Sequence, residues 1–164
     1  MNLLTDNISH KNVESELLKS FELKKIKSSF MGMYCLKNFS ERDVYILFRK
    51  IGYAYRRDPE EYRVQIPDLK LSEYLQSNNI DVENFLLIGF CKLKNYDEIT
   101  LSIFNRIGQK ASNRSYYVNM KSIVKANING KSSWFNAEGF EVITFKSSLI
   151  IDELALRYKN KLMT

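Results

Sequence analysis

The sequence is short of the residue types that most enzymes use for catalysis. It contains one histidine, His10, and two cysteines, Cys35 and Cys91, which lie far apart in the chain. A single imidazole cannot build a zinc or iron site, and the chain offers no Ser-His-Asp or Cys-His pair. Both cysteines stand among apolar residues, as buried, reduced thiols of a cytoplasmic protein do. The sequence therefore predicts no catalytic residue, no metal site and no cofactor.

Glycine and proline are also scarce, with six and two residues, whereas 45% of the chain is hydrophobic and 13% aromatic. This composition excludes disorder and low complexity, and the dispersed glycines form no phosphate-binding loop. The longest apolar run, residues 85–90, is too short to span a bilayer. The first residues lack the basic and apolar regions of a secretory signal. We expect one domain over residues 1–164, located in the cytoplasm and not associated with a membrane.

Acidic residues are absent from residues 99–137. The chain has 25 Lys and Arg against 19 Asp and Glu, so the cations of this segment account for the whole formal charge of +6. The same segment contains the only tryptophan, Trp134, two adjacent tyrosines, Tyr116 and Tyr117, and many Asn and Ser residues. Its six cations are Arg106, Lys110, Arg114, Lys121, Lys125 and Lys131.

Cations interleaved with aromatic and amide side chains are typical of a surface that binds nucleic acid. Lys and Arg neutralise phosphates, aromatic rings stack on bases, and amides hydrogen-bond to base edges. We therefore predict a small, non-enzymatic module that binds DNA or RNA through a basic patch, in a prokaryotic or phage defence, restriction or mobile-element system. The predicted contact residues are Arg106, Lys110, Asn113, Arg114, Tyr116, Lys121, Lys125, Lys131 and Trp134.

Two other functions stay open. The basic face could dock on an acidic protein partner, as in a subunit or an inhibitor, or the chain could be a metal-dependent nuclease that uses carboxylates. Gly32-Met33-Tyr34 followed by Tyr45-Ile46-Leu47 resembles the GIY-YIG nucleases, with Leu47 in place of the final glycine. That resemblance implies Tyr34 and Tyr45 on paired strands, whereas we expect a helix over residues 40–52.

A second pattern resembles the PD-(D/E)xK nucleases. Pro67-Asp68 is followed by an apolar strand that ends at Lys92. The position two residues before this lysine, which the resemblance requires to be acidic, is Phe90. One carboxylate is too few to hold the metal.

We expect the first half of the chain, residues 1–80, to be mainly helical. Apolar residues recur at helical spacing from Val13 to Phe30. Ser40 is a good N-cap for a helix that Gly52 would end. We also expect a brief helix over residues 73–78 and a short strand over 62–66.

Residues 81–146 predict a β-rich part, and residues 147–164 a C-terminal packing helix. Strands are expected over 85–92, 99–104, 116–118 and 140–145. Asn129-Gly130 predicts a hairpin between a strand over 121–129 and a return arm at Trp134, although a helix ended by Gly130 is the alternative. The fold class is α+β: N-terminal helices, about five mostly antiparallel strands in a meander or small open barrel, and a C-terminal helix.

Overall fold

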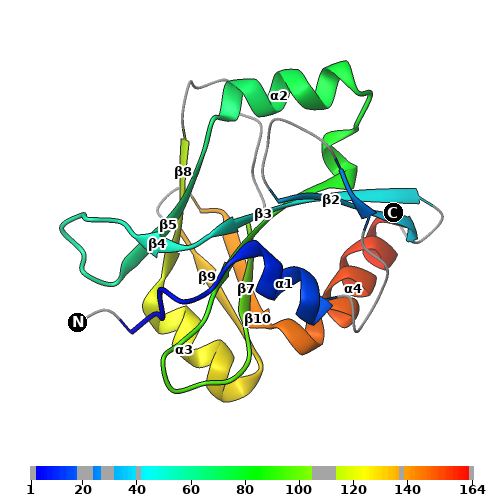
Figure 1. The fold of residues 1–164 in the computed structure, drawn as a ribbon. Coiled ribbons are helices and arrows are strands. Elements are labelled where there is room, and N and C mark those ends of the chain that lie inside the picture. The colour runs from blue at the N-terminus through cyan, green and yellow to red at the C-terminus, as the bar shows by residue number, and fades with distance from the viewer. Residues whose placement is uncertain are drawn as a thin grey trace.

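Two β-sheets of unequal size form the frame of the protein (Figure 1). The computed structural model describes residues 3–17, 24–26, 32–39, 42–104, 114–136 and 139–162. The large sheet has seven strands, in the order β1 (Lys24–Lys25), β2 (Met33–Phe39), β3 (Arg42–Lys50), β6 (Phe85–Cys91), β7 (Thr100–Phe104), β10 (Glu141–Lys146) and β9 (Lys131–Phe135). The small sheet has three, in the order β4 (Gly52–Tyr53), β5 (Glu61–Ile66) and β8 (Arg114–Asn119).

Four α-helices pack on these sheets, so the α+β class is confirmed. Two of them pack on one face of the large sheet, and the other two lie on its opposite face together with the small sheet. They are α1 (His10–Leu17), α2 (Asp68–Ser77), α3 (Met120–Asn129) and α4 (Ile150–Leu162), and two single 3₁₀ turns, η1 (Val82–Asn84) and η2 (Ser147–Leu149), complete the described elements.

Among the described residues, β3 with β6 is the one parallel pair of strands, and the other pairs are antiparallel. A parallel pair cannot be closed by a tight turn and needs a crossover connection. Here the crossover contains β4, β5 and α2, so it supplies most of the small sheet.

The helices α2 and α3 cap opposite ends of the small sheet. Each follows one strand of an antiparallel pair: α2 follows β5, and α3 follows β8 without a gap. Because the two strands run in opposite directions, their helices leave at opposite ends, as Figure 1 shows at the top and bottom. Asn119 caps α3, its side-chain oxygen accepting from the Lys121 N–H at 2.8 Å.

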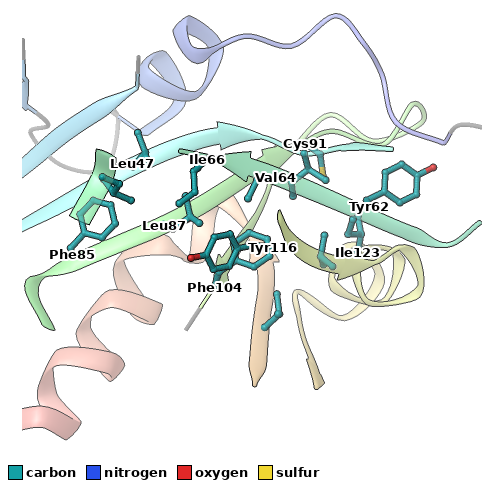
Figure 2. Packing of buried hydrophobic residues seen from close by; sticks show 14 of the residues in the cluster. Leu47, Tyr62, Val64, Ile66, Phe85, Leu87, Cys91, Phe104, Tyr116 and Ile123 are labelled. Atoms are coloured by element: carbon teal, nitrogen blue, oxygen red, sulfur yellow. The ribbon is translucent and has the colours of Figure 1, made fainter. Parts of the chain in front are cut away.

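The large sheet packs on both faces, and its central strands β6 and β7 are buried at every position, whereas the edge strand β9 stays largely exposed. One face packs against the small sheet, α2 and α3, where Leu47, Leu87 and Phe104 meet Val64 and Ile66 (Figure 2). The other face packs against α1 and α4. This double burial explains why every residue of β6 is buried and why its sequence shows no polar alternation.

The predicted helix over residues 40–52 is wrong, because residues 42–50 of this segment form β3. It pairs with β2 antiparallel, with Cys35 opposite Tyr45, and with β6 in parallel. Leu47 faces one core while Val44 and Ile46 face the other. A strand buried on both faces has apolar residues at almost every position, and these also fit a helical stripe. The first third is accordingly less helical than expected, and of residues 18–31 only Lys24–Ile26 lie within the described part.

The Asn129-Gly130 hairpin is also wrong. Residues 120–129 form α3, and Gly130 ends it with φ +91°, its N–H donating to the Ala126 carbonyl oxygen at 2.7 Å. Ile123 and Ala126 lie on the buried face at helical spacing. The helical alternative for this segment is therefore the correct one.

Other expectations hold. The strands expected within 62–66, 85–92, 99–104, 116–118 and 140–145 are β5, β6, β7, β8 and β10, and the C-terminal helix is α4. The helix expected over 73–78 begins earlier, at Asp68. The described part has ten strands rather than about five, because β1 to β4 were not expected; the return arm expected at Trp134 is β9, which pairs with β10 instead of residues 121–129. None of the described helices has the length and apolarity needed to cross a membrane.

Gly89 and Gly52 offer a matched test of this packing. A Cβ at Gly89 would lie 2.7 Å from Cγ1 of Ile51, whereas one at Gly52 would meet nothing within 4 Å. We expect Gly89→Ala to lower the free energy of unfolding by about 1–3 kcal/mol through overpacking. Gly52→Ala should change it by less than about 0.5 kcal/mol. Urea denaturation of both variants checks this, and equal stabilities would contradict the packing described.

We predict that the two buried cysteines are alkylated slowly in the native protein. Burial raises the pKa of Cys91 from 9.0 to about 12 and also raises that of Cys35. Since the thiolate is the nucleophile, iodoacetamide at pH 8 should leave both thiols of the native protein largely unmodified and label both in urea. Folding favours the protonated Cys91 thiol, so this contribution to stability is complete below pH 9 and is lost as the pH rises towards 12. Native labelling at the rate of a free thiol would refute the burial.

Candidate nucleic-acid interface

The small sheet has one buried face and one accessible face. Tyr62, Val64 and Ile66 of β5 point into the core, so Arg63 and Gln65 point outwards. We call this accessible side the outer face; it is formed by Glu61, Arg63, Gln65, Ser115, Tyr117 and Asn119. Arg63 is paired with Tyr117 in register, and Gln65 with Ser115, whose side chains hydrogen-bond at 3.4 Å.

The loop from β4 to β5 folds a second arginine onto this face. The guanidinium carbon of Arg56 lies 4.5 Å from the centre of the Tyr117 ring, the geometry of a cation–π contact. Arg56 also pairs with the Glu61 carboxylate at 3.3 Å, while its side chain stays half exposed. The neighbouring Tyr55 is 83% exposed and has a positive φ of 55°. The loop thus presents an aromatic ring and a guanidinium together.

The base of this loop is anchored by aromatic contacts. The ring centres of Tyr53 and Tyr55 are 4.9 Å apart, and those of Tyr53 and Tyr62 are 5.4 Å apart, both edge to face. Tyr62 is 2% exposed and belongs to the core. The exposed Tyr55 is therefore linked to the core through Tyr53.

The phenol of Tyr117 is a hydrogen-bond centre for the outer face. Burial acts to raise its pKa, but hydrogen bonds with Arg56, Ser115 and Arg63 outweigh it and leave the pKa below its ordinary value. The hydrogen bond with Tyr117 in turn raises the pKa of Arg56. Two cationic donors are thus held on one aromatic side chain.

The predicted lysines are spread over two elements. Lys121 and Lys125 are exposed on α3, one helical turn apart, and Lys121 pairs with Glu60 at 3.3 Å. Lys131 lies on β9 and pairs with the nearly buried Glu153 of α4 at 2.7 Å. Acids from outside residues 99–137 therefore lie beside two of its cations.

The predicted aromatic residues lie in the core or pack against it. Tyr116 is buried (Figure 2), and its hydroxyl donates to Oδ1 of the buried Asp68 at 2.9 Å. Trp134 is half-buried against the same core. Arg106, Lys110 and Asn113 lie outside the described residues. For Arg114 the structure describes the backbone, and β8 begins at this residue.

Sequence reasoning missed Tyr55, Arg56, Arg63 and Tyr117 as site residues. A signal was present, because residues alternate between the two faces of a strand. In β8 that alternation places Tyr117 with Ser115 on the accessible face and Tyr116 in the core. Arg56 and Arg63 gave no basic segment in the sequence, because the acids Asp58, Glu60 and Glu61 lie between them.

The nuclease resemblances find little geometric support. β2 and β3 do pair as the GIY-YIG pattern requires, but Tyr34 is opposite Ile46, so Tyr34 and Tyr45 lie on different faces of the sheet. The buried Tyr34 hydroxyl donates to Glu14 Oε2 at 3.1 Å. Among the described residues, no group of three or more His, Cys, Asp or Glu side chains could hold a metal ion.

The chain matches a protein family described as Methylase-associated X1 (MTaX1) over residues 42–154. The chain belongs to this family. The matched segment runs from β3 into α4, so it includes the whole small sheet and the outer face. The family's description suggests an association with a methylase, as in a restriction-modification or defence system. Neither the curated proteins nor the solved structures provide a match.

The two adjacent tyrosines should respond differently to loss of the hydroxyl. Tyr116→Phe removes a hydrogen bond to a buried carboxylate, so we expect the free energy of unfolding to fall by about 1–3 kcal/mol. Tyr117→Phe removes hydrogen bonds on an accessible face, where water can replace them, so its effect should be smaller, at most about 1 kcal/mol. Thermal and urea unfolding of both variants checks the assignment of faces, and a reversed order would overturn it.

Proposed function

We propose that this chain is a non-enzymatic nucleic-acid-binding module of a methylase-associated system and that the outer face is its contact surface. The observation that carries the proposal is the contact of Arg56 with the Tyr117 ring, together with the pairing of Arg63 opposite Tyr117, on an accessible sheet face. Guanidinium groups bind phosphates in a planar, bidentate manner.

The remaining groups of the outer face suit the same ligand. Gln65, Ser115 and Asn119 offer amides and hydroxyls of the kind that contact sugar-phosphate backbones and base edges. The exposed ring of Tyr55 is available for stacking on a base. An aromatic ring beside paired arginines is a combination that recurs in proteins that bind single strands.

The cations of α3 extend this surface in the proposal. Lys121 follows β8 within two residues, and Lys125 lies one turn further along the helix. Arg106, Lys110, Asn113 and Arg114 directly precede β8 in the sequence or begin it, and they are proposed to bind phosphates. Lys131 and Tyr116 contribute less in this proposal, because Glu153 and Asp68 already hold them.

The proposal is tested by charge reversal on the outer face. Arg56→Glu/Arg63→Glu should weaken binding of a fluorescent DNA duplex of about 20 base pairs, or of the corresponding single strands, by at least about tenfold in roughly 100 mM salt. The slope of log K against log salt should become less negative by about 0.9 for each duplex phosphate that the variant no longer neutralises. Fluorescence anisotropy measures both quantities.

The matched control is Lys70→Glu/Lys94→Glu, which makes the same change in net charge at exposed lysines on α2 and in the loop after β6. It should retain most of the affinity. Equal reductions in affinity for the two double variants would mean that net charge alone drives binding. If the unmodified protein binds neither DNA nor RNA but retains an acidic protein partner, the protein-docking alternative is correct.

A further inference from the structure

A charged pocket lies on a different part of the molecule, where β1, β2 and β3 meet the C-terminal end of α2. Its volume is about 370 Å³. Lys24, Cys35 and Tyr45 are register partners on three neighbouring strands, so they form one row across the sheet. Tyr74 and Asn78, from α2 and the residue that follows it, form the opposite wall.

The rim of this pocket is cationic. Lys24, Lys25 and Lys37 line it and are exposed, whereas Asp43 is the acid among the lining residues. Three ammonium groups and one carboxylate give the pocket a net charge of +2. A cavity with this charge and with long lysine side chains at its edge favours an anionic group, such as a phosphate.

The interior of the pocket is aromatic and polar. Tyr45 and Tyr74 are half-buried, and a hydrogen bond joins the Tyr45 hydroxyl to the Cys35 thiol. Burial raises the pKa of the Tyr45 hydroxyl above its ordinary value. Asn78 is fixed at the edge because its Nδ2 donates to the Tyr74 carbonyl oxygen at 2.8 Å. The pocket therefore combines flat rings with an amide and a carboxylate.

We propose that this pocket binds one nucleoside monophosphate unit. The lysines hold the phosphate, Tyr45 and Tyr74 contact the base, and Asp43 and Asn78 hydrogen-bond to its edge. A volume of 370 Å³ lies near the lower end of the range for ligand pockets, about 300–1,000 Å³, which suits one nucleotide rather than a dinucleotide. The unit is either a free nucleotide or a nucleotide extruded from a strand, as enzymes that flip bases accommodate it.

This site is separate from the outer face. None of the residues that line the pocket belongs to β4, β5 or β8. Lys24, Lys25, Cys35 and Lys37 also precede residue 42, where the family match begins. The nucleotide site can therefore fail while the proposed function holds, and the reverse is also true.

Isothermal titration calorimetry of the full chain tests the site. The probes are the four deoxynucleoside monophosphates, the matching nucleosides, and inorganic phosphate. We expect at least one nucleotide to bind about tenfold or more tightly than both its nucleoside and phosphate. Lys24→Gln/Lys37→Gln should weaken that binding by at least about tenfold. Lys70→Gln/Lys94→Gln, at exposed lysines outside the pocket, should leave it unchanged, as should Arg56→Glu/Arg63→Glu.

A second arm distinguishes the two sources of the ligand. If the nucleotide belongs to a strand, a single strand of about 12 nucleotides should bind to the Arg56→Glu/Arg63→Glu variant and should lose affinity when Lys24→Gln/Lys37→Gln is added. If inorganic phosphate binds as tightly as every nucleotide, the pocket is a simple anion site and the proposal is overturned. Absence of pocket-dependent binding with both free nucleotides and the strand would also overturn it.

Discussion

The parallel pairing of β3 with β6 is the constraint on which the rest of the structure depends. Two parallel neighbours cannot be joined by a hairpin, so the chain between Lys50 and Phe85 must cross over one face of the large sheet. That crossover carries β4, β5 and α2, which bury this face and leave an accessible surface on the other side. The candidate interface thus exists because the central strand pair is parallel.

The outer face also shows how charge along a sequence differs from charge in space. The acid-free segment draws attention to Lys121 and Lys131, yet Glu60 and Glu153 fold beside them. Arg56 also pairs with an acid, Glu61, but its guanidinium contacts the Tyr117 ring as well. A carboxylate that pairs with a cation reduces its value for a ligand, whereas a ring contact holds the cation in place on the outer face without adding negative charge.

Much of the fold could be predicted from local patterns. The alternation of β5, the apolar run of β6 and the acidic first turn of α4 correspond to elements of the expected type. β3 could not be predicted, because burial on both faces removes its alternation. For the site, the sequence indicated the region of β8 but selected Tyr116 instead of Tyr117, a choice that depends on which face of the strand meets the core. The alternation along β8 places the two tyrosines on opposite faces, but long-range packing decides which of these faces meets the core.

The crossover has a further consequence for how this protein can vary. One continuous stretch, from Asp43 to Asn78, supplies two walls of the nucleotide pocket, the Arg56 loop and the Arg63 strand. The pocket and the outer face lie on different parts of the molecule, but this single span of chain supplies residues to both. A recombination event that exchanged this span would change part of the pocket and part of the outer face together. The specificity of the pocket therefore could not be replaced in this way without altering the outer face.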